Sequence, residues 1–483
     1  MRKSSLSALV AAGLLAGGLS AGSASAADLG GNCCADLEER IAELEATTAR
    51  KGNRKVSLTI SGWVGEQVMW WDDGAEQNVY VTGLGSTLAS NVKFTGQATI
   101  APGWYAGYVL HMELIDSDSL TINQFTQQGP NAVNGGNQNV TTLQSFWFLK
   151  SDHLGKVGIG KQSSASDNAA ILVDSSGSLV PANWVLFDTN GFFLRSKSAG
   201  LLVAPNALGT PAGLNWGQFG GYCQAGGGTG GDCFGVPQQA IRYDSPTYAG
   251  FSVSAAWGGD DFWDAAARYA GEYNGIKLAA AVAYTEYSGN FWFGNGQQYA
   301  AFVPQVFANN DDAKTMKYFQ LGAYIEHVPT GLWLYGAYGH LETDGITAAT
   351  TDFTTASGVD IFTADAGNRA VPDGNTYYIK GGLRERWTHL GHTVLYGEYA
   401  KYNNSVSDVF INNGYEASTQ LWGLGVVQEI DAAAMSLWLS YRHLSADVDC
   451  KNAGLCGLTA GGEAALGDLE DFQYVKFGGL INF

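Results

Sequence analysis

Residues 242–287 read RYDSPTYAGFSVSAAWGGDDFWDAAARYAGEYNGIKLAAAVAYTEY, and this stretch decides the fold. Within it, Asp264 and Arg268 share one parity, opposite to that of Trp263. Alternation with a period of two is typical of β-strands that have one polar and one apolar face. The short turn EYNG at 272–275 separates two such segments. The stretch therefore predicts consecutive antiparallel hairpins.

Working outward from this stretch, 16 alternating segments of about 8–15 residues follow one another between residues 56 and 483. Short turns follow the even-numbered segments, as at 101–103, 152–155 and 388–391, whereas most connections after odd-numbered segments are long. An up-and-down membrane barrel requires short and long connections at opposite ends, but a soluble Greek-key sandwich does not. We therefore expect an all-β fold, a 16-stranded antiparallel transmembrane β-barrel over residues 55–483.

The segment TYYIKGGLRERW at 376–387 shows the two faces that such a barrel needs. Ile379 has the opposite parity to Lys380 and Arg384. Strands of an outer-membrane barrel turn an apolar row toward lipid and a polar row toward the lumen. Trp and Tyr residues lie near the ends of many segments, which is typical of the belts at a membrane interface.

Composition argues against several functions. Only 15% of the residues are charged, the formal net charge is −19 and the pI is near 4.6, which excludes nucleic acid as a sensible partner because phosphate binding needs Lys and Arg. The histidines are scattered without metal-ligand spacing, and AGGGTGG at 225–231 lacks the Lys-Ser/Thr of a phosphate-binding loop. We expect no enzyme activity, no metal and no cofactor. A hydrolase built on the barrel wall is the enzymatic alternative.

The first 26 residues read as a signal peptide. A positive start at Arg2 and Lys3 precedes an apolar run, and Ala24-Ser25-Ala26 fits a cleavage site. The segment is too short to span a membrane stably, so we expect cleavage and export. An uncleaved anchor is the alternative.

Residues 27–54 are expected to form a periplasmic helical segment. ADLEERIAELEATTARK at 35–51 places Leu37, Ile41 and Leu44 at the spacing of a heptad seam. Two heptads are too few to be stable alone in water, so this short coiled coil needs neighbouring copies that are already held together. A solitary solvated helix is the alternative reading.

Six cysteines are consistent with an oxidising compartment. Cys223 with Cys233, and Cys450 with Cys456, each bracket a short segment rich in Gly, Asn or Asp, and we predict a disulfide in each case. Unpaired thiols are the first alternative, and zinc is a weaker one. The pairing of the adjacent Cys33 and Cys34 stays open.

The exported leader, the ADLEERIAELEA helix, the RYDSPTYAGFSVSAAWG segment and the closing KFGGLINF together resemble the alphaproteobacterial outer-membrane porin family. The resemblance covers nearly the whole mature chain. It implies a homotrimeric channel in the Gram-negative outer membrane, through which small hydrophilic solutes and ions diffuse passively. It also implies that the third long loop, about 165–237, folds inward and that the outer-membrane assembly machinery recognises the terminal Phe483.

A long loop inside such a barrel would narrow the aqueous channel and place charges at its tightest point. Acids on the loop that face bases on the wall would then set up a transverse field. Removal of the leader's two basic residues leaves 24 basic and 45 acidic residues, a net charge of −21, which predicts a preference for cations. A substrate-selective channel and a structural outer-membrane protein are the alternatives. The candidate lining residues are Asp167, Asp174 and Asp188 on the loop, and Arg242, Arg268, Lys380, Arg384 and Arg386 on the wall.

Overall fold

The computed structural model describes most of the predicted barrel and none of residues 1–54. The predicted signal peptide, the seam at Leu37, Ile41 and Leu44, and Cys223, Cys233 and Cys456 therefore lie outside the described residues, as does the side chain of Cys450. The described residues are 55–115, 117–127, 139–195, 197, 215–217, 235, 237–259, 261–288, 315–344, 347–348, 369–370, 373–403, 415–450 and 469–483.

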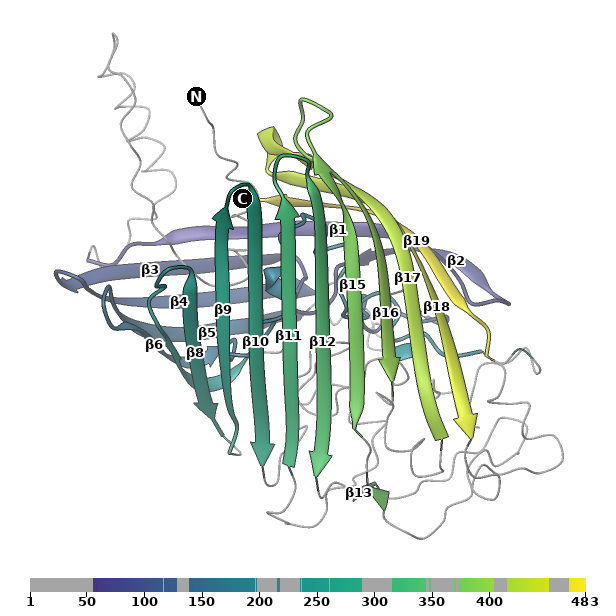
Figure 1. Ribbon diagram of the computed structural model, residues 1–483, viewed down its shortest axis with the longest axis horizontal. Coiled ribbons are helices and arrows are strands. Elements are labelled where there is room, and N and C mark those ends of the chain that lie inside the picture. The colour runs from purple at the N-terminus through teal and green to yellow at the C-terminus, as the bar shows by residue number, and fades with distance from the viewer. Residues whose placement is uncertain are drawn as a thin grey trace.

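The described chain is almost entirely β-structure (Figure 1). No helix within these ranges is long and apolar enough to cross a membrane. The strands are β1 (Thr59–Asp72), β2 (Gln77–Gly83), β3 (Asn91–Ala101), β4 (Trp104–Ile115), β5 (Asn139–Ser151), β6 (Gly155–Gln162), β7 (Gln238–Asp244), β8 (Phe251–Gly258), β9 (Trp263–Tyr273), β10 (Ile276–Ser288), β11 (Thr315–His327), β12 (Leu332–Asp344), the short pair β13 (Thr347–Ala348) and β14 (Arg369–Ala370), β15 (Gly374–Glu385), β16 (Thr393–Asn403), β17 (Tyr415–Ile430), β18 (Met435–Cys450) and β19 (Phe472–Asn482).

The first and last strands close the sheet into a barrel. β1 pairs antiparallel with β19, from Trp63 opposite Asn482 to Asp72 opposite Gln473. At the very end, Phe483 and Gly62 exchange two backbone hydrogen bonds of 3.1 Å. All the other paired strands of the large sheet are also antiparallel, and the pairings run from β1 through β3 and β4 around to β18 and β19 without a break. The predicted closed 16-stranded barrel is confirmed.

One predicted long connection is partly a strand. Long connections were expected after odd-numbered segments, but β2 occupies much of the one that follows the first segment. β2 pairs with the second half of β1 and β3 pairs with the first half, so the two together fill one position in the wall. This is why 17 strands of the large sheet make a barrel of 16 positions. Between them the chain turns inward, where Leu88 O accepts a 3.1 Å hydrogen bond from Trp63 Nε1.

The two faces of the wall match the predicted alternation. On β15, Ile379 is 50% exposed on the outer face, whereas its neighbour Lys380 is 1% exposed on the inner face. On β19, Phe477 is exposed on the outside and Lys476 is buried on the inside. The apolar outer row is the one that lipid would cover, and the polar inner row surrounds the lumen.

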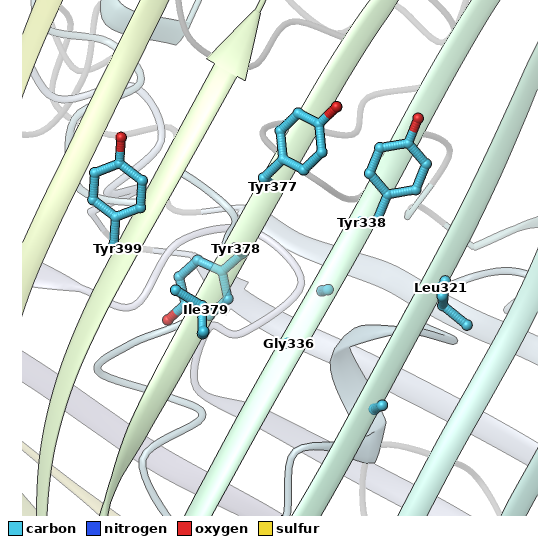
Figure 2. A pocket seen from close by; sticks show the side chains of 9 residues that line it. Leu321, Gly336, Tyr338, Tyr377, Tyr378, Ile379 and Tyr399 are labelled. Carbon is cyan, nitrogen blue, oxygen red and sulfur yellow. The ribbon is translucent and has the colours of Figure 1, made fainter.

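Aromatic side chains mark an edge of the apolar outer band (Figure 2). Tyr338, Tyr377 and Tyr399 lie on adjacent strands with their hydroxyl groups pointing the same way. Tyr338 donates a 2.8 Å hydrogen bond to Asn375 Oδ1, so the polar ends of the rings meet polar side chains. On the other side of the rings, an apolar hollow of about 380 Å³ lies over Gly336. This order of polar, aromatic and apolar groups is the one found at a membrane interface.

Glycines in the wall lie opposite large rings on the inner face. Trp438 faces Gly478 across β18 and β19, and a Cβ added to that glycine would lie 2.4 Å from Cζ2 of the ring. Tyr396 faces Gly425 in the same way, with 2.5 Å from the added Cβ to the phenol oxygen. The missing side chain lets the ring lie flat on the neighbouring backbone, which explains glycine at a position where strands normally disfavour it.

We expect Gly478→Ala to destabilise the barrel, because the added methyl group forces the Trp438 ring or the strand to move. Overpacking of this kind costs about 1–3 kcal/mol. The thermal midpoint of the detergent-solubilised barrel should fall. Gly336→Ala is the matched control, because the closest atom to its added Cβ is 3.8 Å away. An equal fall in both variants would contradict the role of the ring.

Candidate functional site: the barrel lumen and its inward loop

The loop that follows β6 turns into the barrel and is held there from its first residues. Asp264 on β9 accepts hydrogen bonds from the backbone N–H of Ala165 at 3.1 Å and of Ser166 at 2.7 Å. The Ser166 hydroxyl donates to the same carboxylate at 2.7 Å. The sequence placed Asp264 on the polar parity but did not single it out, because a local pattern does not show which backbone groups a carboxylate will meet.

Two predicted lining residues, Arg242 and Arg268, hold the same part of the loop. Arg242 Nη1 donates to the carbonyls of Ser163 and Ser164, both at 2.9 Å. Arg268 Nη2 donates to the carbonyl of Ala165. Both side chains therefore donate hydrogen bonds to the loop backbone.

The loop then crosses β11 and β12 in close contact with the wall. Gln320 accepts from Ala170 N at 3.0 Å and donates to Ser166 O at 2.9 Å, and Tyr335 donates to Ala170 O at 2.8 Å. Gly322 permits this approach, because a Cβ there would lie 2.3 Å from Ala170 O. Gln320 and Tyr335 carry no charge and bind distant backbone groups, so the sequence pattern does not reveal their role.

Asp174 and Lys380 form a completely buried ion pair at the centre of the loop. Lys380 Nζ lies 2.6 Å from Asp174 Oδ2, and neither side chain is exposed. The same ammonium group donates to Ala182 O at 2.6 Å and lies about 6 Å from the rings of Trp333 and Tyr335. Carboxylate, carbonyl and aromatic faces thus replace the water that a lysine normally requires.

A later part of the loop, residues 183–188, is fixed across the seam that closes the barrel. Asp188 accepts from Gln67 on β1 through one oxygen and pairs with Lys476 on β19 through the other. Close by, Arg442 donates to Asn183 O and pairs with Glu398 at 2.7 Å. Asp188 therefore joins the first and last strands of the barrel.

These contacts correct the expected transverse field. Asp174 and Asp188 touch their bases directly and are buried, so they do not face them across open water. Arg384 pairs with Glu429 at 2.9 Å beside the loop, whereas Arg386 is exposed and pairs with Asp431 at a short turn. Of the predicted bases, Arg242, Arg268 and Lys380 anchor the loop. Arg384 lies beside the loop, and Arg386 lies at the short turn.

Asp167 is the loop acid whose ionisation the site opposes. It is almost fully buried, and Asn168 donates to its Oδ1. Burial raises the pKa of Asp167 to about 7, repulsion from Asp264 adds to the rise, and the Arg242 and Arg268 charges oppose it. In the folded barrel this carboxyl group is therefore mostly protonated below about pH 7.

A pH test follows from that shift. The folded pKa of Asp167 is higher than the unfolded one, so its contribution to stability is present in acid and is lost as the pH rises through about 7. Asp167→Asn imitates the protonated form. We expect its thermal midpoint to match that of wild type near pH 3, below the unfolded pKa of about 4, and to exceed it at pH 8. The same difference at both pH values would contradict the shifted pKa.

Asp174→Asn tests the buried pair. It leaves the Lys380 charge buried without its carboxylate, which typically costs about 3–5 kcal/mol. The loop of the folded barrel should then be cut faster by added protease, and the open-channel conductance should become noisier. Asp431→Asn is the control, because its pair with Arg386 is exposed and worth about 0–1 kcal/mol. Unchanged protection in Asp174→Asn would refute the anchoring role.

Comparison with known proteins agrees with this architecture. A sequence model of the family described as Gram-negative porin matches residues 6–447. No curated protein matches the chain. Among the groups that the structure describes, no cluster of three or more His, Cys, Asp or Glu side chains could hold a metal ion.

Several solved structures are similar to the chain at low identity. OmpF of Salmonella typhi, in complex with daunomycin, is 12% identical with a TM-score of 0.47, covering 89% of this chain and 99% of its own. OprB of Pseudomonas putida is 10% identical with a TM-score of 0.48, covering 93% and 97%. OmpT of Vibrio cholerae is 12% identical with a TM-score of 0.45, covering 89% and 99%.

Proposed function

We propose that this chain, a member of the Gram-negative porin family that forms an outer-membrane channel, passes small hydrophilic solutes and ions by passive diffusion. The observation that carries the proposal is the loop docked inside a closed barrel. Wall residues from Asp264 on β9 to Gln67 on β1 bind the loop. These contacts hold the loop in place, so it narrows the lumen. A barrel of this size would otherwise enclose a wide aqueous channel.

The residues that pin the loop set the width in this proposal. Asp167, Asp174, Asp188, Arg242, Arg268, Lys380 and Arg384 belong to the constriction because each touches the loop or lies beside it. Buried pairs hold the loop at a fixed depth, and the polar groups that stay in contact with water line the remaining passage. Selection by size then follows from a rigid boundary.

Assembly completes the proposal. We assign residues 1–26 to a cleaved signal peptide and 27–54 to a periplasmic segment whose seam, Leu37, Ile41 and Leu44, joins the copies of a homotrimer. Cys223–Cys233 and Cys450–Cys456 are the proposed disulfides. Phe483, exposed beside the closing strands, is the proposed signal to the assembly machinery. The motifs favour an alphaproteobacterial branch of the family.

Single-channel recording tests the function. Purified mature protein added to a planar lipid bilayer should insert in steps of three equal conductances. Polyethylene glycols that are small enough to enter should lower the conductance, and larger ones should leave it unchanged. A bilayer that stays silent after insertion of folded protein would refute the channel and favour a structural role.

A further inference from the structure

We propose that the inner wall formed by β3, β5 and β6 is a lysine surface that makes the channel favour small anions, such as phosphate and carboxylates. The inference rests on the proposed channel and names its class of solute. Its principal residues are Lys93, Lys150 and Lys156. Lys150 and Lys156 were not among the expected lumen-facing bases.

The passage lies on this side because the described loop occupies the other side. Between residues 165 and 190 the loop bonds to β9, β10, β11, β12, β15, β16, β18, β19 and β1. Figure 1 shows β3 to β6 crossing behind β9 to β18, as the opposite wall of the barrel. The Lys156 side chain on this wall is 23% exposed, whereas the Lys380 side chain, which the loop covers, is not exposed at all.

The register brings the lysines together on the inner face. Lys150 lies directly opposite Lys156 across β5 and β6, on the same parity as the buried Phe148. Lys93 lies opposite the buried His111, and Lys93 and Lys156 are near enough to repel each other. Like charges that face each other across strands are destabilising. Anions are therefore attracted to this wall, because they reduce the repulsion between its lysines.

The acids near this wall do not cancel the charge. Asp244 lies 3.0 Å from Lys156 and 2.7 Å from Arg242, so one carboxylate is shared between two bases. Glu113 is buried and accepts a hydrogen bond from Thr87 N. Asp152 lies at the short turn, where it accepts from Tyr105. Within the described residues, Lys93 and Lys150 form no ion pair.

Four acids of the opposite side are neutralised by direct pairs. Asp174, Asp188, Glu398 and Glu429 each pair with a lysine or an arginine. The net charge of −21 that predicted a cation preference therefore does not describe the wetted wall. Rings of Lys or Arg line anion and phosphate pores. Each lysine ammonium group is a strongly hydrated point charge, and a passing anion can replace part of its water.

Reversal potentials test the proposal. Wild-type channels in a planar bilayer with a tenfold KCl gradient should give the sign expected for a higher chloride than potassium permeability. Lys150→Gln and Lys93→Gln should each lower the chloride-to-potassium permeability ratio by about twofold, the effect of one unit charge at about 8 Å in water. Lys150→Glu should lower it further. Inorganic phosphate should reduce the wild-type chloride current more than that of Lys93→Gln/Lys150→Gln.

Controls separate this inference from the channel itself. Lys401→Gln removes a lysine on the outer face of β16, opposite Tyr377, and should leave the ratio unchanged. Migration of the unheated protein as a folded barrel on a gel checks each variant. Conductance that prefers potassium, or a ratio that the two Gln variants do not change, would overturn the lysine wall and leave the porin intact. Absence of any conductance would overturn both.

Discussion

Backbone hydrogen bonding is the constraint on which the rest of this structure depends. In the hydrocarbon of a membrane, an unpaired N–H or C=O group has no water to bind, so a sheet is tolerated only when its last strand meets its first. The pairing of β1 with β19, completed by Phe483 and Gly62, meets this condition. Strand alternation, belt aromatics and glycines beneath rings are all arrangements that a closed, tilted wall makes possible.

Much of the wall could be predicted because its rule is local. Lipid on one side and water on the other impose a period of two, and Ile379 and Lys380 show that period directly. Connection lengths added the direction of each strand. β2 escaped prediction because the chain continues one wall position with two strands, and only the pairing of both with β1 reveals it.

The lumen was much harder to predict from the sequence. Asp174 and Lys380 are separated by 206 residues, and their contact depends on the path of the loop, which no periodicity encodes. The sequence identified most of the charges in the lumen but gave them the wrong relation, as charges that face each other instead of touching. Asp264, Gln320 and Tyr335 were missed because they bind backbone groups, which are the same at every position. The fold could be predicted from the sequence pattern, whereas the shape of the pore depends on tertiary contacts.

The position of Asp188 has a consequence for the geometry of the pore. Its two oxygens bind Gln67 on the first strand and Lys476 on the last, so both partners are present only after the ends of the chain have met. A barrel in which β1 and β19 have not paired would leave Asp188 without one of these two partners. The position of the loop at Asp188 therefore depends on closure of the wall, which couples the geometry of the pore to the seam that holds the barrel together.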